Sequence, residues 1–548
     1  MIIGIDMGGT HCDGVLIDQH KVQKKEKQLT DESNIKNAVL SLLKSLLENQ
    51  NKSKIEKIIL STTIVTNTLS KNQQLNAGLF LIPGLGAPFQ KILDQVSNSY
   101  VSQNGYVDHR GVEVARVSND EYESAYEFFK EKKINHIAVV SKFSTRNNIQ
   151  EKKAEDFFSS KGMKVYKGSD FSGKLNFPRR CITAYLTASV AEIYEKMIND
   201  IKEGIREIGV NAPIYILKAD AGAVTLEESL NFPIESVLSG PAASIMGALY
   251  SKDIPQTGDS MVLDIGGITT DLGFFIDGEP ILEPLGIQLK SMKSLVRALK
   301  VFPLAIGGDT LFDFDNMGKV KLDNKRLGVA YTFGGPKATL TDVFLSLDHD
   351  DKKALEGLKK EITQNFEFSL RNIQEATSDF LVNEIKQRIN EINSEPIYTV
   401  KDFFHRKKFQ PAKLILIGGA APYFKNVIQK ALNIEVIVPD HFEICNAIGS
   451  ALSQVTAEVN LFANTADGTL SIPEMGYFEK VPRSFHEKNA KELALEKLSE
   501  LAKKRGLSGK IDYEITEYSS FNMVRGFSTN GKNIRIKAQV KPGLSEDY

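Results

Sequence analysis

The 548-residue sequence predicts an α/β protein in which two related α/β domains flank a cleft and a smaller α+β unit follows. The main observation is an internal repeat. Residues 1–18 and 261–278 share an apolar run, an aspartate, a Gly-Gly pair and a second aspartate seven residues after the first. A third apolar run, 413–417, also ends in Gly-Gly. An internal repeat implies duplicated domains, and a cleft between such domains is a common ligand site.

The repeated turns contain residue types that suit a phosphate site. Asp6 and Asp264 each close a predicted buried strand, and a Gly-Gly pair follows one residue later. Glycines let backbone N–H groups approach an anion, while the carboxylate faces a metal ion or an attacking water. A single Gly-Gly turn is more often an ordinary hairpin. Three such turns, each closing a predicted strand, instead favour loops that face each other across one nucleotide.

Composition argues against several classes of function. Charged residues make up 25% of the chain and hydrophobic ones 42%, as in globular proteins. The net charge of −1 gives no electrostatic basis for binding nucleic acid or an acidic membrane surface. Cys12, Cys181 and Cys445 lack metal-like spacing, so we expect neither a disulfide framework nor a zinc site. Without a signal segment or a long charge-free apolar run, we expect a cytoplasmic protein.

The first predicted domain, residues 1–175, alternates strands and helices. A strand at 2–5 returns through a hairpin to 14–18, and an amphipathic helix covers 33–48. The alternation then continues to the end of the domain, which predicts a layered α/β structure. Its further strands are expected at 55–60, 77–82 and 136–140, and its further helices at 120–132 and 148–160.

Polar residues at three places are candidates for contacts with a substrate. Thr62, Thr63 and Asn67 lie just past a predicted strand, where crowded hydroxyls indicate either a helix cap or a loop that faces a ligand. Arg110 lies in a loop rich in turn residues and could meet a substrate anion, although an exposed polar turn explains it as well. Asp309 directly follows another Gly-Gly pair.

The second predicted domain covers residues 176–460. It opens with a long helix at 181–203, which contains neither Gly nor Pro, and it contains a charged helical insertion around 350–394. The strand at 413–417 runs through Gly418, Gly419 and Ala420 into a helix, a geometry that accommodates the backbone contacts of a nucleotide. The tail, 461–548, is predicted to form an α+β unit. It has a helix near 487–505 and strands near 510–517 and 532–539.

This order of motifs resembles the sugar kinase/Hsp70/actin superfamily, whose duplicated domains are ribonuclease H-like. In that comparison residues 6–13 and 264–271 are the two phosphate loops and 417–421 the adenosine motif. A longer series of segments, spread from residue 1 to about 450, resembles the hydantoinase A-like members of the hydantoinase/oxoprolinase family. The segments are Ile5–Thr10, Ser61–Asn67, Leu238–Ala242, Leu263–Gly267, Gly334–Asp342 and Gly418–Pro422.

The resemblance implies an ATP-dependent hydrolase subunit that uses Mg²⁺. Such a chain phosphorylates the carbonyl of a cyclic amide, 5-oxoproline or hydantoin-like, or of a related small compound such as a ketone. The resemblance also leaves open a homo-oligomer and a hydantoinase B-like partner subunit. It gives Asp6 and Asp264 catalytic and metal-binding roles. The residues it places around ATP are Gly8, Gly9, Thr10, Asp13, Gly266, Gly267, Thr269, Thr270, Gly418, Gly419 and Ala420.

Three segments depart from the pattern of this family. Ile268 stands where relatives have a small hydroxyl residue. Residues 218–222 are Lys-Ala-Asp-Ala-Gly instead of Ser-Asp-Gly-Gly, and residues 305–333 lack much of the glycine-rich sequence of the family. The substrate therefore stays open. Two other functions use the same phosphate loops. One is an actin- or Hsp70-like ATPase switch or reactivating factor that acts on a protein partner, and the other is a small-molecule kinase.

Overall fold

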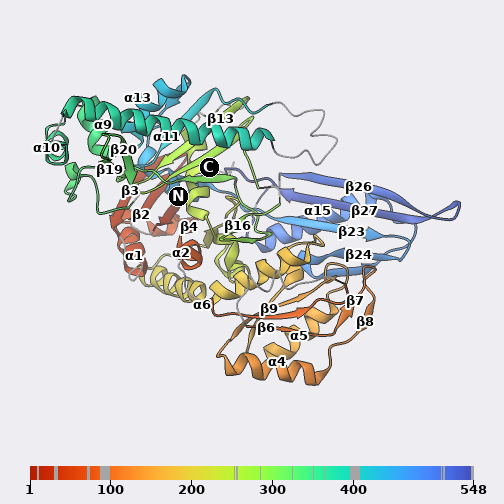
Figure 1. The fold of residues 1–548 in the computed structure, drawn as a ribbon. Helices are drawn as coiled ribbons and strands as arrows, with labels where there is room; N and C mark the ends of the chain where they lie inside the picture. The colour runs from red at the N-terminus through yellow and green to blue at the C-terminus, as the bar shows by residue number, and fades with distance from the viewer. Residues whose placement is uncertain are drawn as a thin grey trace.

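The computed structural model describes most of the chain, and Figure 1 shows the C-terminal sheet, in blue, beside the orange part that contains β6 and β9. No helix among the described residues is long and apolar enough to cross a membrane. The described residues are 1–8, 11–29, 35–70, 75–86, 99–251, 254, 257–283, 285–323, 325–349, 351–362, 365–394, 408–507, 509 and 512–544.

The first sheet has the strand order β12-β11-β4-β1-β2-β3. The β1–β2 and β2–β3 pairs are antiparallel, whereas β4 lies parallel to both β1 and β11. The apolar side chains of β1 and β4 are buried, which places this sheet in the largest core. Its strands are β1 (Ile2–Met7), β2 (His11–Asp18), β3 (Lys21–Leu29), β4 (Lys57–Thr62), β11 (Ile214–Leu217) and β12 (Ala223–Thr225).

The second sheet repeats this pattern, with the order β15-β14-β13-β21-β22 and β18 paired to β14. Here β13 and β14 are antiparallel, and β21 is parallel to both β13 and β22. The duplication predicted from the repeated segments is therefore confirmed by the strand pairing. The strands are β13 (Asp259–Ile265), β14 (Thr270–Ile276), β15 (Glu279–Pro280), β18 (Val301–Leu304), β21 (Lys413–Ile417) and β22 (Glu435–Ile437).

Two short helices, α8 (Ser239–Ala248) and α14 (Cys445–Leu452), pack against each other between the sheets. Their crossing is close because glycines face backbone. A Cβ atom on Gly247 would lie 1.8 Å from the carbonyl oxygen of Cys445. Helix α14 also packs on β1, where a Cβ on Gly4 would lie 2.1 Å from the carbonyl oxygen of Ala447. These small residues therefore hold the two halves of the molecule together.

A parallel four-stranded sheet, ordered β10-β9-β5-β6, branches from the first half. The long helix α6 (Phe177–Ile208) follows it and contacts β9, as the yellow helix in Figure 1 shows. This helix begins four residues before the predicted one and ends at Ile208, and it is capped by Gly209, which is left-handed with φ +78. The other elements of this part are β5 (Gly78–Ile82), β6 (Tyr100–Ser102), β7 (Tyr106–Val107), β8 (Glu113–Ala115), α4 (Asn119–Glu131), β9 (His136–Ser141), α5 (Ile149–Ser160) and β10 (Lys164–Lys167).

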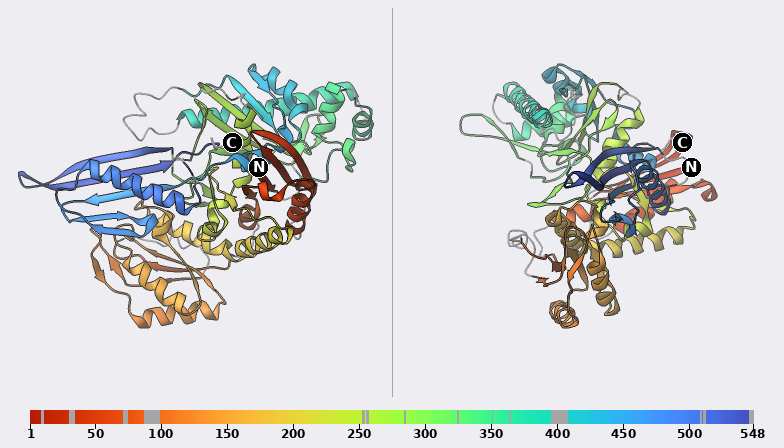
Figure 2. Two further views of the ribbon diagram at one scale, coloured as in Figure 1. Left: turned by 180° about the vertical axis from the view of Figure 1, so that it is seen from behind. Right: turned by 90° about the vertical axis from the view of Figure 1, so that its right-hand side faces the viewer.

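The C-terminal unit is an antiparallel sheet ordered β25-β24-β23-β27-β26, with its own core against α15. The β26–β27 hairpin projects away from the rest of the molecule (Figures 1 and 2). The α+β unit predicted for the tail is confirmed, although both hairpin strands extend beyond their predicted ranges. Its elements are β23 (Glu458–Asn464), β24 (Thr469–Ile472), β25 (Tyr477–Lys480), α15 (Glu487–Lys504), β26 (Tyr513–Arg525) and β27 (Ser528–Val540).

The remaining elements cover the two repeated sheets. β11 and β12, from the segment that the sequence assigns to the second domain, pair within the first sheet, so the boundary near residue 175 stays a proposal. The remaining helices are α1 (Ile35–Leu46), α2 (Ile64–Ser70), α7 (Leu226–Ser229), α9 (Leu340–His349), α10 (Lys352–Glu361), α11 (Phe366–Ser394) and α13 (Ala421–Leu432). The remaining strands are β16 (Gln288–Leu289), β17 (Met292–Lys293), β19 (Leu311–Phe314) and β20 (Val320–Asp323).

Candidate active site

A cleft of about 600 Å³ lies where the two repeated sheets face each other. Residues from both Asp-x-Gly-Gly turns and from the third glycine turn line it, so one cavity collects all three motifs. Gly9 and Thr10 lie outside the described residues. The candidate residues that line the cleft are Asp6, Gly8, Asp13, Asn67, Asp264, Gly266, Gly267, Thr269, Asp309, Gly418, Gly419 and Ala420.

The repeated aspartates occupy the same place in each sheet. Asp6 at the end of β1 pairs in register with Asp13 on β2, and Asp264 at the end of β13 pairs with Asp271 on β14. Register partners on antiparallel strands point to the same face of a sheet. Each half of the molecule therefore presents two neighbouring carboxylates, and this arrangement follows directly from the seven-residue spacing.

Asp6 is held by two neutral donors. The Ser61 hydroxyl donates to Oδ1 at 2.5 Å, and Nδ2 of Asn446 donates to Oδ2 at 2.8 Å. Burial raises the pKa of Asp6 to about 6; the Ser61 hydrogen bond opposes the shift and the charge of Asp13 adds to it. A carboxyl with a pKa close to neutrality can accept and release a proton under physiological conditions.

Asp13 and Asp264 complete the acidic centre of the cleft. Oδ1 of Asp13 lies 2.8 Å from Nζ of Lys27, and Oδ2 accepts a hydrogen bond from Asn446 at 2.9 Å. Burial also raises the pKa of Asp264, an effect that a Ser244 hydrogen bond opposes. The charge of Asp264 in turn contributes to the raised pKa of Asp6, so the two halves interact electrostatically across the cleft.

This donor set fits Mg²⁺ bound together with a phosphate ligand. Carboxylates whose pKa values are raised by burial and by one another gain from a nearby cation. Among the described residues, no three His, Cys, Asp or Glu side chains converge to hold a metal ion by themselves. Mg²⁺ commonly binds through one or two carboxylates, with phosphate oxygens and water as its other ligands. Asp6 and Asp264 are the residues that would hold it.

The cleft-lining side chains that sequence reasoning missed include Lys27, Arg326 and Asn446. Lys27 belongs to a run that reads as a solvated charged face, yet its strand, β3, turns it toward Asp13. Asn446 was visible only as a polar residue in a helix of small residues. Arg326 lies in an irregular segment that has no motif. Of the three, only Asn446 could have been identified from the sequence, because it is a polar residue in a helix of small residues.

Four other predicted residues lie away from this cleft. Thr270 is buried, and its hydroxyl donates to the carbonyl of Ile306 at 2.8 Å. The backbone N–H of Thr62 donates to the Ser239 hydroxyl, and the Thr63 hydroxyl donates to the carbonyl of Met7. These contacts fix the packing around β4 and α8. Arg110 lies in the turn between β7 and β8, where it pairs with Asp108 at 2.7 Å. The sequence-based substrate candidates that line the cleft are Asn67 and Asp309.

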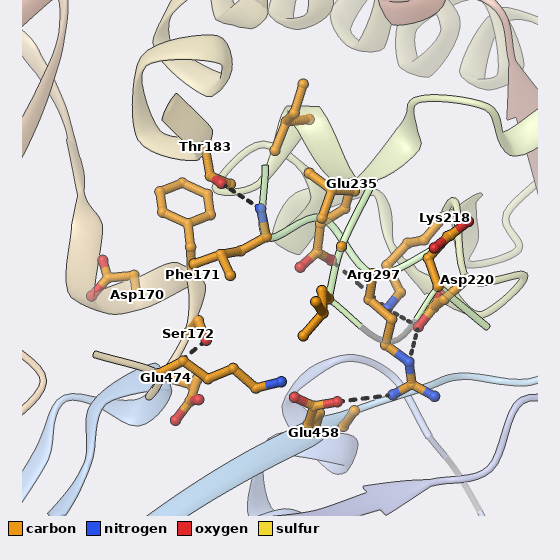
Figure 3. A pocket seen from close by; sticks show the side chains of 18 of the residues that line it. Asp170, Phe171, Ser172, Thr183, Lys218, Asp220, Glu235, Arg297, Glu458 and Glu474 are labelled. Carbon is orange, nitrogen blue, oxygen red and sulfur yellow. Dashed lines mark hydrogen bonds and ion pairs between the residues drawn. The ribbon is translucent and has the colours of Figure 1, made fainter. Parts of the chain in front are cut away.

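A second cavity, of about 100 Å³, lies beside the C-terminal sheet and is lined by charged side chains (Figure 3). Figure 3 shows the Arg297 guanidinium between Asp220, 3.6 Å away, and Glu458, 3.3 Å away. Lys218 lies 3.2 Å from the same Asp220 carboxylate. These charges neutralise one another, and the cavity is too small for a nucleotide. The larger cleft is therefore the candidate active site.

Comparison with known families gives two matches along the chain. The model described as hydantoinase/oxoprolinase matches residues 180–459, and the model of the hydantoinase/oxoprolinase N-terminal region matches residues 2–162. The alpha subunit of caprolactamase from Pseudomonas jessenii is 20% identical over 83% of this chain and 70% of its own. The beta subunit of acetone carboxylase from Xanthobacter autotrophicus is 19% identical over 85% of this chain and 72% of its own.

Solved structures resemble nearly the whole chain. The crystal structure of the ATP-dependent caprolactamase from Pseudomonas jessenii superposes with a TM-score of 0.72 at 16% identity, over 99% of this chain and 88% of its own. A nucleotide-free acetone carboxylase structure gives a TM-score of 0.71 at 15% identity, over 99% and 87%. At these identities the likeness concerns the fold. It confirms the duplicated α/β architecture with an added C-terminal sheet.

Proposed function

Because the chain belongs to the hydantoinase/oxoprolinase family, we propose that it is an ATP-dependent subunit that phosphorylates the carbonyl oxygen of a small substrate. The substrate class proposed is a cyclic amide, such as 5-oxoproline or a hydantoin, or a related small carbonyl compound. The observation that carries the proposal is that one cleft collects both Asp-x-Gly-Gly turns and the third glycine turn. The caprolactamase and the acetone carboxylation reaction are both ATP-dependent, which supports the choice of nucleotide.

The proposed position of ATP follows from the three turns. Its phosphates lie between the turns that begin at Asp6 and Asp264, and its adenosine lies along Gly418 and Gly419. Gly418 is left-handed with φ +90, and a Cβ there would lie 2.4 Å from Oδ1 of Asp264. A Cβ on Gly419 would meet nothing within 4 Å, so its backbone is open to a ligand. A larger side chain at residue 419 is therefore expected to obstruct the nucleotide.

In the proposed reaction the carbonyl oxygen of the substrate attacks the γ-phosphorus of ATP. The bond between the γ-phosphorus and the β–γ bridging oxygen breaks, and its electron pair leaves with ADP. Phosphorylation activates the carbonyl carbon of a cyclic amide, so that water can add to it. The C–N bond then breaks as the nitrogen takes up a proton, and the resulting acyl phosphate is hydrolysed to a carboxylate and inorganic phosphate. Most of the catalysis of phosphoryl transfer is positioning and charge neutralisation.

The chain's own groups have distinct proposed roles in this step. Asp6, oriented by Ser61 and Asn446, would hold Mg²⁺ or a water beside it. Asp264 faces Asp6 from the other half and would hold the same ion at the polyphosphate end of the cleft. When bound, Mg²⁺ supplies neutralisation of the phosphate charge. Phosphoryl transfer and ring opening are separable steps in this scheme.

We also propose a partner subunit for the complete reaction. The curated relatives are named as the alpha subunit of caprolactamase and the beta subunit of acetone carboxylase. By analogy, this chain would carry out activation, and a second, hydantoinase B-like chain would complete hydrolysis. The proposal predicts that the isolated chain couples ATP turnover to substrate but leaves most of the lactam or hydantoin unopened.

ATP turnover measured against a panel of small carbonyl compounds tests this proposal. The panel contains 5-oxoproline, hydantoin, caprolactam and acetone, each with Mg²⁺. We expect at least one compound to stimulate ATP turnover. In Asp6→Asn and Asp264→Asn the rate of this turnover should fall about 100-fold or more. Asp18→Asn, at the exposed end of β2, is the matched control and should keep full activity.

Three results would contradict the proposal. Unchanged turnover in both Asp6→Asn and Asp264→Asn would remove the assigned site. ATP turnover that no panel compound stimulates, but that a protein partner does, would favour the ATPase switch. A stoichiometric, stable phosphorylated product that a hydantoinase B-like partner chain does not convert further would instead identify a small-molecule kinase.

A further inference from the structure

We propose that Arg326 is a catalytic residue that contacts the phosphoryl group being transferred, with Asp309 as the residue that positions it. This inference rests on the proposed function, because it takes the large cleft as the ATP site. Arg326 lies in the irregular segment between β20 and α9, and its side chain lines the cleft beside the second Gly-Gly turn.

The geometry places the guanidinium directly over the second phosphate turn. A Cβ atom on Gly267 would lie 2.5 Å from Oδ2 of Asp309 and 3.9 Å from Nη2 of Arg326. The missing side chain at Gly267 is thus what admits both groups. Any side chain at residue 267 would collide with the Asp309 carboxylate and displace the arginine. A cation at this position lies where the phosphates are proposed to bind.

Asp309 is itself fixed to that turn. Its backbone N–H donates to the carbonyl of Gly267 at 2.7 Å, and its Oδ2 lies 3.0 Å from Nε of Arg326. An arginine has five N–H donors in a planar fork. An ion pair through Nε orients the fork and leaves donors that can reach phosphate oxygens. The pair therefore sets the direction of the guanidinium without using all of its donors.

A second carboxylate anchors the loop that follows Arg326. Asp342, which is fully buried, accepts the backbone N–H groups of Tyr331, Thr332 and Thr339, each at 2.8 or 2.9 Å. The Thr332 hydroxyl also donates to it at 2.6 Å. The segment from 326 to 339 is therefore held by charge-assisted hydrogen bonds at its far end. A preorganised donor stabilises developing charge without a reorganisation cost at the moment of reaction.

Two polar side chains of the first half lie in the same cleft as Arg326. Lys27 and His11 line the same cleft from the first sheet. Burial lowers the pKa of His11, and the charges of Lys27 and Arg326 lower it further, while the charge of Asp13 opposes the shift. Lys27, paired with Asp13, and Arg326, paired with Asp309, thus bring a positive charge from each half of the molecule to the cleft, where a triphosphate would gain from both.

Nucleotide affinity tests the inference independently of turnover. Arg326→Ala should weaken binding of a non-hydrolysable ATP analogue about 10-fold or more. The affinity of the same variant for ADP, which lacks the γ-phosphate, should fall less than about 3-fold. Arg371→Ala, on the exposed face of α11, is the matched control and should change neither affinity. Equal affinity of the analogue for the wild type and Arg326→Ala would overturn the inference while leaving the ATP site intact. A wild-type chain that binds neither nucleotide would overturn the inference together with the proposed function.

The rate of ATP turnover, and its rescue by guanidinium, is a second measurement. A purely structural role of Arg326 would not explain such a rescue. The kcat for ATP should fall about 100-fold or more in Arg326→Ala and less in Arg326→Lys. Guanidinium ion added at millimolar concentration should restore part of the kcat of Arg326→Ala and leave Arg371→Ala unaffected. Asp309→Asn should lower kcat with a smaller change in affinity, because the arginine loses orientation and keeps its charge. A kcat loss in Arg326→Ala that guanidinium does not restore, with a matching loss of thermal stability, would overturn the catalytic assignment.

Discussion

Nδ2 of Asn446 lies 2.8 Å from the Asp6 carboxylate, although 440 residues separate them in the sequence. The same atom lies 2.9 Å from Oδ2 of Asp13, so one amide group joins the two carboxylates of the first half. Asn446 is at the start of α14, the helix that also contacts α8. The packing between the halves therefore sets the orientation of the proposed catalytic aspartate.

Replacement of Asn446 should impair ATP turnover. Asn446→Ala removes one of the two donors to Asp6, and we expect kcat to fall about 10-fold or more. Asn446→Asp should be worse, because it places a third carboxylate beside Asp6 and Asp13. Asn390→Ala, on the exposed side of α11, is the control. Equal kcat values for the wild type and Asn446→Ala would show that Ser61 alone orients Asp6.

Replacement of Gly247 should separate the two central helices. In Gly247→Ala the new Cβ would lie 1.8 Å from the backbone oxygen of Cys445, and relief requires a shift of a whole helix. We expect a stability loss of about 2 kcal/mol or more. Gly162→Ala is the comparison, since its φ is +83 but its Cβ would meet nothing within 4 Å. That variant isolates backbone strain, about 1 kcal/mol. Thermal unfolding midpoints should therefore fall further for Gly247→Ala, and the reverse order would contradict the packing account.

Arg180 should be one of the most sensitive positions for stability. It is fully buried at the start of α6, where its guanidinium donates to the Ser144 hydroxyl at 2.5 Å and lies 3.7 Å from Glu151. Arg180→Met leaves the Glu151 carboxylate buried without its counter-charge, which typically costs about 3–5 kcal/mol.

The control for Arg180 is an exposed ion pair of the same region. Lys153→Met removes one of the two cations that pair with Glu113, the other being Arg116, and such pairs near the surface contribute about 1 kcal/mol or less. The double variant Arg180→Met with Glu151→Gln should recover part of the lost stability in thermal unfolding. No recovery would show that the hydrogen bonds of Arg180, and not its charge, dominate.

Glu474 should make stability depend on pH. Burial raises its pKa to about 7 from an ordinary value of 4.5, and the hydrogen bonds from Asn460 and Gly173 only partly oppose this. The folded state therefore favours the protonated carboxyl. Its stabilising contribution is complete below about pH 4.5 and is lost as the pH rises through 7. The loss corresponds to at most about 3 kcal/mol.

Glu474→Gln, which stays neutral, tests this pH dependence. Relative to the wild type, its thermal midpoint should rise between pH 5 and pH 8. The exposed Glu479→Gln is the control and should follow the wild type at both values. A constant difference between Glu474→Gln and the wild type across this range would mean that Glu474 is ionised throughout.

Local patterns were enough to predict most elements whose side chains alternate between core and solvent. The helix expected at 120–132 is α4, and the helix expected near 487–505 is α15, each within a residue or two. Strand β3 was missed because its residues are almost all polar, with one face in solvent and no apolar alternation. The outer parts of β26 and β27 were missed for the same reason, since their pairing partner, and not burial, defines them.

The sequence by itself determined the duplicated fold and the aspartate and glycine residues of the cleft. These follow from spacings of a few residues, because a strand end and a turn place Asp6 or Asp264 next to its glycines whatever the rest of the chain does. Only the tertiary structure decided which other side chains join them. Asn446 and Arg326 reach the cleft through the packing of α14 and the anchoring of the 326–339 loop, whereas Thr270 turns into the core. Such convergence depends on contacts between distant segments, and no local periodicity encodes it.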